Sequence, residues 1–313
     1  MKVKKILITG GAGYIGSKLA TRLLNMNYEV TVLDNLMFAD NSLNHLFSKK
    51  NMNFFKGDTN NKKFIKKHIK NKDIIIPLAA LVGAPLCEKY KKLAVETNLN
   101  AIEYLVKNLK KNQKIIYPTS NSGYGIGEKN KYCDERSPLN PISLYGKTKA
   151  DAEKKVLNFK NSVCFRLATI FGYSYRMRTD LLVNNFVYRA IKEKKLSLFQ
   201  PHFRRNYIHV EDVVNAFIFA IENFSKVKGE IFNLGLSSAN LTKLQLARRI
   251  KKQVPKLKIK IVYNKKDPDQ RDYFVSNKKI EKLGFKAKFT IDKGIKELVS
   301  IFSHSKTKIK NNY

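Results

Sequence analysis

Two side chains four residues apart, Tyr145 and Lys149, have the spacing that a proton-transfer pair requires. Residues 144–159 have the pattern of a helix, and positions i and i+4 of a helix share one face. An ammonium group beside a phenol favours the phenolate and lowers the pKa of the phenol. The pair therefore predicts that Tyr145 can act as a base near neutral pH. Ser120, at the end of the preceding predicted strand, adds a hydroxyl group to this set.

Glycine spacing near the N-terminus predicts a dinucleotide-binding loop over Gly10-Gly11-Ala12-Gly13-Tyr14-Ile15-Gly16. This loop follows an apolar predicted strand at 3–8 and leads into a predicted helix at 14–27. Gly10 permits the tight turn, Gly13 lets the backbone approach a pyrophosphate, and Gly16 lets the helix pack closely on the strand. The helix N-terminus adds free N–H groups and a positive dipole end, which both favour phosphate binding.

Carboxylates end the second and third predicted strands. Asp34 lies 18 residues beyond Gly16, where a carboxylate accepts hydrogen bonds from ribose hydroxyls and repels a 2′-phosphate. This favours NAD over NADP. Asp58 is a candidate for the adenine edge, and the neighbouring Asn35 and Thr59 join the cofactor-binding candidates. The alternative for both carboxylates is an ordinary turn residue at a strand end.

Strand-like and helix-like segments alternate over the first half of the chain, which is typical of a Rossmann-type, doubly wound parallel α/β sheet. Ligands of such sheets bind at the carboxyl ends of the strands. After about residue 170 the alternation loosens. We therefore expect an NAD-binding domain over 1–168 and a smaller α/β substrate-binding lobe over 169–304, partly interleaved with the sheet. A polar tail is expected over 305–313.

Size and composition are those of a soluble enzyme. The 313 residues are 43% hydrophobic and can bury a large core, and no apolar run has transmembrane length. No signal peptide is visible. The three cysteines, Cys87, Cys133 and Cys164, have neither a metal-ligand nor a Cys-x-x-Cys spacing. We therefore expect a reduced, cytoplasmic protein without a metal site.

The balance of 61 basic against 25 acidic residues gives a formal charge of +36. Such an excess suggests either binding to nucleic acid or membrane surfaces, or lysines that cover solvated faces. The lysines are scattered along the chain, and no ladder of aromatic residues is interleaved with them. The second interpretation is favoured, with neither nucleic acid nor membrane as partner. A basic surface would still attract an anionic substrate.

With these motifs the chain resembles the extended short-chain dehydrogenase/reductase family, the NAD-dependent sugar-nucleotide epimerases and dehydratases, over nearly its whole length. The resemblance implies that Ser120, Tyr145 and Lys149 form a catalytic triad. It also implies a cofactor site to which Tyr145 and Lys149 belong, with Lys149 holding the nicotinamide ribose. The other implied cofactor residues are Gly10, Gly13, Tyr14, Ile15, Gly16, Asp34, Leu78, Ala79, Ala80, Asn98 and Thr119.

Residues 204–213 resemble the late signature of that family, in which Arg205 would hold a substrate diphosphate as a bidentate fork. Further substrate candidates are Ser120, Asn121, Thr169, Arg176, Arg178, Asn184 and Arg271. For any single loop arginine, a solvated surface charge is the alternative. The implied reaction is hydride transfer from C4 of a nucleotide-linked sugar to NAD while Tyr145 removes the hydroxyl proton.

The two residues after Ser120 discriminate within the family. Family dehydratases carry an Asp-Glu pair there, and Asn121 and Ser122 cannot act as acid or base near neutral pH. Simple oxidation at C4, or epimerisation through a 4-keto sugar, remains. The strings at 75–87, 121–129, 166–172 and 202–207 resemble the branch acting on GDP-D-glycero-D-manno-heptose in Campylobacter capsule biosynthesis, which oxidises C4.

Two rival functions stay open at this point. A UDP-glucose 4-epimerase-like enzyme needs the same triad, and a non-catalytic NAD-sensing or nucleic-acid-binding regulator could use the same fold. Intact Ser120, Tyr145 and Lys149 argue against the regulator. The family resemblance also implies a homodimer, in which helices 90–111 and 144–159 would pair with their symmetry mates in a four-helix bundle.

Overall fold

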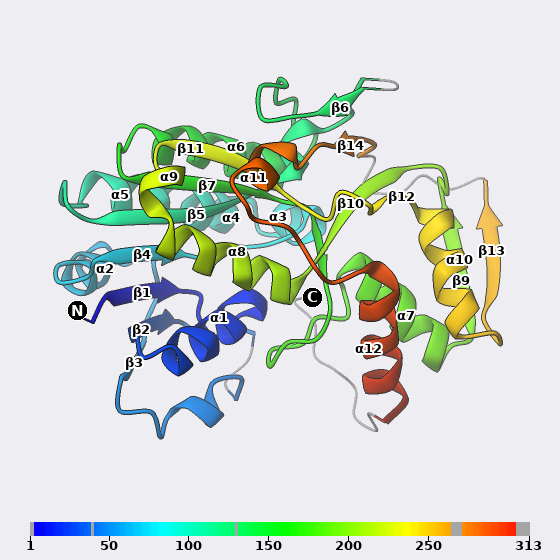
Figure 1. Cartoon of the computed structure of the whole chain (residues 1–313), viewed down its shortest axis with the longest axis horizontal. Coiled ribbons are helices and arrows are strands. Elements are labelled where there is room, and N and C mark those ends of the chain that lie inside the picture. Colours follow the sequence, from blue (N-terminus) through cyan, green and yellow to red (C-terminus); the bar gives the residue numbers. More distant parts are fainter. Residues whose placement is uncertain (1–2, 39–40, 129–130, 264–270, 305–313) are drawn as a thin grey trace.

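A seven-stranded parallel sheet forms the centre of the computed structural model, which describes residues 3–38, 41–128, 131–263 and 271–304 (Figure 1). Its strands are β1 (Lys5–Thr9), β2 (Glu29–Asp34), β3 (Met52–Lys56), β4 (Ile74–Pro77), β5 (Lys114–Ser120), β7 (Ser162–Leu167) and β11 (Glu230–Leu234). They lie in the order β11-β7-β5-β4-β1-β2-β3. The predicted doubly wound Rossmann-type sheet is confirmed. The predicted polar tail at 305–313 lies outside the described residues.

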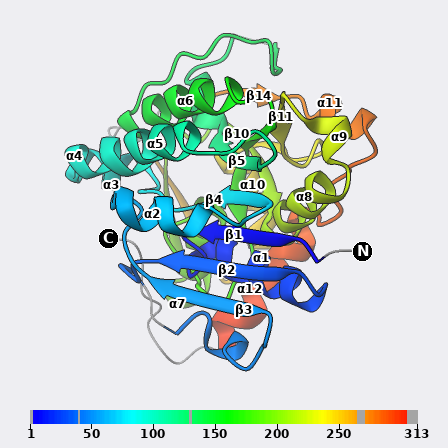
Figure 2. The ribbon, with the colours of Figure 1, turned by 90° about the vertical axis from the view of Figure 1, so that its left-hand side faces the viewer.

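Helices cover both faces of this sheet because successive side chains of a strand point to opposite sides. Ile6 and Ile8 face one core and Leu7 faces the other, and all three are fully buried. The first core is closed by α1 (Tyr14–Asn25) and α8 (Val210–Glu222), and the second by α2 (Lys62–Ile69), α5 (Ala101–Lys107) and α6 (Leu144–Leu157) (Figure 2).

The helix predicted at 90–111 is interrupted in the structure. A short helix α3 (Ala84–Lys89) precedes α4 (Lys91–Val95), and a π-helical turn at Glu96–Asn100 joins α4 to α5. A π-helical turn inserts an extra residue and changes which side chains face inward. Here Asn98 is buried within it, and both ends of its side-chain amide bond the backbone of Leu81.

A second lobe lies beside the sheet. Its strands are β8 (Thr169–Phe171), β10 (Arg204–His209) and β12 (Asn240–Thr242) in one sheet, β9 (Lys195–Phe199) and β13 (Lys258–Val262) in another, and β6 (Tyr132–Cys133) with β14 (Phe274–Val275) in a third. Its helices are α7 (Leu182–Lys192), α10 (Lys243–Gln253) and α12 (Ile291–His304), whereas α11 (Lys278–Lys282) packs on β11 through the buried Ile280. The chain beyond residue 169 also returns to the large sheet through α8, α9 (Phe224–Val227) and β11.

Three free cysteines are buried, and no helix of the described ranges combines the length and apolar character needed to cross a bilayer.

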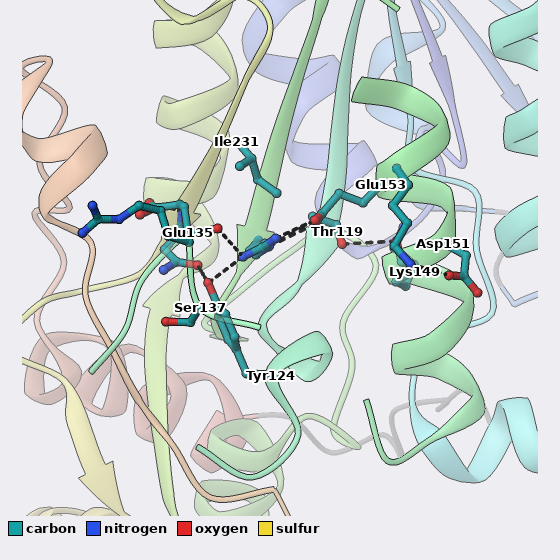
Figure 3. Close-up of polar contacts among 12 residues, drawn as sticks. Thr119, Tyr124, Glu135, Ser137, Lys149, Asp151, Glu153 and Ile231 are labelled. Atoms are coloured by element: carbon teal, nitrogen blue, oxygen red, sulfur yellow. Dashed lines mark hydrogen bonds and ion pairs between the residues drawn. The ribbon is translucent and has the colours of Figure 1, made fainter. Parts of the chain in front are cut away.

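A buried ion pair joins α6 to the sheet. Arg166 of β7 donates to Glu153 of α6 at 2.7 Å, and the two side chains are only 7% and 3% exposed. The other amino group of Arg166 donates to the Tyr124 hydroxyl at 2.9 Å. Figure 3 shows Glu153 one turn along the same helix from Lys149, with Tyr124 on the opposite side of the network. The pair therefore holds the helix that carries Tyr145 and Lys149.

Replacing Glu153 by Gln should lower the free energy of unfolding by about 3 kcal/mol, because the buried Arg166 cation then has no counter-ion. Asp151→Asn is the matched control, since Asp151 lies on the same helix in an exposed pair with Lys154 and should change stability by less than about 0.5 kcal/mol. Urea unfolding of both variants checks this. Equal losses in the two variants would contradict it.

Candidate active site

The glycine loop packs against the end of β4 with no room for side chains. Gly10 has φ +69°, and a Cβ there would lie 2.5 Å from the Ala79 nitrogen. A Cβ on Gly16 would lie 2.4 Å from the Gly10 carbonyl oxygen. Helix α1 starts after Gly13 without a side-chain cap, and residues 13–16 line a cavity of about 510 Å³. This cradle fits a dinucleotide pyrophosphate, which needs close backbone approach and N–H donors.

Asp34 closes the same part of the cavity. Its two oxygens accept hydrogen bonds from the backbone N–H groups of Ala12, at 2.9 Å, and Leu36, at 2.8 Å. Burial raises the pKa of Asp34, and these two hydrogen bonds and the charge of Arg176 oppose that rise. Asn35 and Asp58 are hydrogen-bonded to each other at 3.2 Å. Further lining residues from the cofactor candidates are Thr59, Leu78, Ala79, Ala80 and Thr119.

Three asparagines differ from the expectation that they line the site. Asn98 instead supports the wall, since it bonds the backbone of Leu81 immediately beyond the groove residues 78–80. Asn184 accepts from the Gly172 N–H at 3.0 Å and donates to the Arg178 carbonyl at 2.8 Å, so it holds the loop after β8. Asn121 is 1% exposed and lies outside the cavity lining. Asn98 and Asn184 therefore support the cavity wall through backbone hydrogen bonds, whereas both side-chain polar atoms of Asn121 are buried without a hydrogen-bond partner in the described part of the chain.

The three catalytic candidates meet in this cavity. Ser120 comes from the end of β5, and Tyr145 and Lys149 come from the first turns of α6. Tyr145 is hydrogen-bonded to Ser120, whose Oγ lies 2.8 Å from the Oγ of Ser122. Arg271 donates to Ser122. A chain of polar groups therefore runs from Arg271 to the phenol of Tyr145.

The pKa of Tyr145 differs from expectation. Burial raises it, while the hydrogen bond from Ser120 and the charges of Arg271 and Arg178 lower it. Lys149, expected to lower this pKa, instead donates from Nζ to the hydroxyl of Tyr117 at 2.7 Å and lies 4.0 Å from the centroid of its ring. Burial lowers the pKa of Lys149 itself to about 7.

Cationic side chains are numerous in the lining of the same cavity. Of the residues named as substrate candidates, Thr169, Arg176, Arg178, Arg205 and Arg271 line it. Arg178 is paired with Asp180, and Arg205 lies 5.8 Å from the ring centroid of Tyr273.

Five polar residues in or beside this cavity were not predicted from the sequence as site residues. They are Tyr117, which bonds Lys149, and the lining residues Ser122, Asn185, Lys243 and Tyr273. Tyr117 and Ser122 adjoin a recognised strand end, and Tyr273 follows Arg271, so proximity could have indicated them. Lys243 is the first residue of α10, and the motif around it, the capping box of Thr242 and Gln245, indicates only the start of a helix.

Comparison with known proteins places this geometry in context. The model of the NAD dependent epimerase/dehydratase family matches residues 6–235. A dTDP-D-glucose 4,6-dehydratase of Dictyostelium discoideum is 30% identical over 275 residues, which cover 79% of this chain and 62% of that protein. The chain therefore spans less than two thirds of that relative. A CDP-paratose 2-epimerase of Salmonella typhi is 30% identical over 272 residues, covering 75% and 80%.

Among solved structures, a UDP-glucose 4-epimerase of Thermotoga maritima with UDP-glucose is similar at a TM-score of 0.84 and 25% identity. The match covers 95% of this chain and 98% of that one. Similarity of this extent includes both the sheet and the second lobe.

The low pKa of Lys149 predicts a pH dependence of stability in cofactor-free protein. Between pH 7 and pH 10 the unfolded chain keeps a proton on Lys149 that the folded chain has lost, so the free energy of unfolding rises with pH. Relative to Lys149→Met, the rise should be on the order of a few kcal/mol. Urea unfolding at several pH values measures it, and parallel profiles for the two proteins would contradict the prediction.

Proposed function

Because the chain belongs to the NAD dependent epimerase/dehydratase family, and is therefore an enzyme with NAD as cofactor, we propose that it oxidises a nucleotide-linked sugar at C4. One observation carries the proposal. A single cavity brings together the glycine loop, the set Ser120, Tyr145 and Lys149, and cationic side chains that include Arg205. A dinucleotide, a proton acceptor and an anionic diphosphate can therefore be held side by side.

Each catalytic residue has a role in this reaction. Bound NAD supplies the hydride acceptor. Tyr145 takes the proton of the sugar hydroxyl, and Ser120, hydrogen-bonded to it, orients both groups. The charges of Arg178 and Arg271 favour the phenolate form of Tyr145, which acts against the effect of burial. Lys149 has a pKa of about 7, so its protonated and neutral forms are both populated near neutral pH.

Elimination of water is poorly supported by the residues beside Ser120. Asn121 is buried outside the cavity lining, and Ser122 bridges Ser120 and Arg271. Neither side chain exchanges a proton near neutral pH. Oxidation at C4 needs no further acid or base, so it is the reaction that this set of side chains supports best.

The proposed substrate is GDP-D-glycero-D-manno-heptose, oxidised to its 4-keto form for capsule or surface polysaccharide synthesis. The sequence strings at 75–87, 121–129, 166–172 and 202–207 support this choice. The relatives named above act, by their names, on dTDP-, CDP- and UDP-linked sugars. Arg205, Arg271 and Lys243 in the cavity suit the diphosphate that all of these nucleotides share.

A 4-epimerase is the second candidate. The similarity to a UDP-glucose 4-epimerase over nearly the full length of both chains favours it, and the same three catalytic residues would serve. The two candidates differ only in whether the 4-keto sugar leaves or is reduced again on its other face.

The proposal also includes a cytoplasmic location and a homodimer. Three free, buried thiols support a reducing compartment. Helices α5 and α6 lie side by side on one face of the sheet, which supports pairing with a second copy there (Figure 2). Light scattering after size exclusion measures the oligomeric state.

Incubation with NAD and GDP-D-glycero-D-manno-heptose should yield a product lighter by two hydrogen atoms, with GDP-mannose and UDP-glucose as control sugars. Mass spectrometry of the products measures this. An unchanged mass with a new stereoisomer would establish the epimerase instead. Loss of water would contradict both candidates, and no change in any sugar would contradict the substrate assignment.

Tyr145→Phe should lower kcat by about 100- to 10,000-fold, because the base that accepts the hydroxyl proton is removed. Tyr263→Phe is the matched control, since Tyr263 is 83% exposed and should leave the rate unchanged. Initial rates of NADH formation check both variants. A loss of less than about tenfold in Tyr145→Phe would be incompatible with its role as base.

A further inference from the structure

Six cationic side chains line the cavity, and five of them donate a hydrogen bond to a described residue. These are Lys149 to Tyr117, Arg178 to Asp180, Arg205 to the Arg204 carbonyl, Lys243 to the Phe199 carbonyl and Arg271 to Ser122. The sixth, Arg176, makes no hydrogen bond within the described part of the chain, and its Nη2 atom is buried.

Burial of the Arg176 guanidinium without a hydrogen-bond partner in the described part of the chain is unfavourable. Its side chain is 5% exposed, and its pKa is lowered to about 10 by burial and by the charge of Arg178. A guanidinium group has five N–H donors, and leaving buried donors unpaired costs free energy. The same group is well suited to an anion that enters the cavity, because charge-assisted hydrogen bonds are the strong ones.

The loop that carries Arg176 lies directly on the first turn of α1. Ser174 donates from Oγ to the Tyr14 carbonyl at 2.6 Å, and its Oγ lies 3.1 Å from the Oγ of Ser17. The Tyr14 hydroxyl in turn donates to the Gly172 carbonyl at 2.6 Å. These contacts place Arg176, two residues beyond Ser174, beside the N-terminus of α1 and its positive dipole end.

The guanidinium of Arg176 also faces the end of β2. Its central carbon lies 5.4 Å from the ring centroid of Phe38, and its charge lowers the pKa of Asp34. The other lining residues near Asp34 and the glycine loop are uncharged or acidic. They are residues 10 and 12–16, Asp34, Asn35, Asp58, Thr59 and residues 78–80. Arg176 is therefore the cation that the described lining offers at the cofactor end.

We propose that Arg176 binds the pyrophosphate of the dinucleotide, as a cationic partner to the glycine loop. The inference rests on the cofactor site of the proposed function and adds a residue from the second lobe to it. The planar fork of Arg matches a phosphate bidentately, and its positive charge attracts the phosphate anions.

Titration calorimetry with ADP-ribose tests this proposal on the full chain. Three proteins are compared after removal of bound nucleotide, namely the unsubstituted chain, Arg176→Met and Arg176→Lys. Met keeps the apolar stem that packs on Phe38 and removes the charge. Arg189→Met is the matched control, because Arg189 is a surface residue paired with Glu193 on α7. We expect ADP-ribose to bind Arg176→Met about 10- to 100-fold more weakly, Lys to restore part of the loss, and Arg189→Met to bind normally.

A second readout locates the contact. Phosphorus NMR of ADP-ribose bound at saturating concentration should show both phosphate lines shifted in Arg176→Met, with the adenine proton lines unmoved. Without nucleotide, Arg176→Met should unfold at a temperature no lower than the unsubstituted chain, because it loses an unpaired buried charge.

Three results would overturn the proposal. The first is an affinity of Arg176→Met within about twofold of the unsubstituted chain. The second is a loss of affinity in which the adenine lines move and the phosphate lines do not, which would assign Arg176 to the adenosine end. The third is failure of the unsubstituted chain to bind ADP-ribose, which would overturn the cofactor site and the proposed function together.

Discussion

A parallel sheet has to be covered on both faces, since its strands alternate apolar side chains between two cores. In this protein that constraint places α1 and α8 on one face of the sheet and α2, α5 and α6 on the other. With all seven strands parallel, their carboxyl ends share one edge. Asp34 and Ser120 are the last residues of their strands there, and Gly10 and residues 78–80 directly follow theirs. Gly10 lies so close to Ala79 that the backbone of the glycine loop packs directly on the backbone at the end of β4.

Burial dominates the electrostatics around the catalytic residues, because their ionisable groups have little contact with water. Burial raises the pKa of Tyr145 and lowers that of Lys149, so both groups are shifted toward neutral forms. Arg271 reaches Tyr145 through Ser122 and Ser120, and its charge favours the phenolate. Proton affinity at Tyr145 is thus coupled to side chains of the second lobe as well as to its own helix.

The loop between β8 and α7 connects the two lobes. Its backbone is held by Asn184 of α7, by the hydroxyl of Tyr14 in α1, and by Glu297 of α12, which accepts from the Tyr173 N–H at 2.9 Å. Glu297 also pairs with the buried His209 at 2.8 Å, so His209 has a structural role. The loop therefore has a defined path across the groove, and Arg176 and Arg178 enter the cavity from it.

Local residue types by themselves determined the glycine loop, the carboxylate at the end of β2 and the helical spacing of Tyr145 and Lys149, because each depends on neighbours within a few positions. They also indicated the sheet, since burial on both faces leaves a pattern in every strand. Tertiary structure alone decided that Lys149 bonds Tyr117, that Arg271 bonds Ser122 across 149 positions of sequence, and that Asn98 and Asn184 support the walls. Those contacts depend on strand register and on which way a helix turns its side chains, and neither is encoded in a short stretch of sequence.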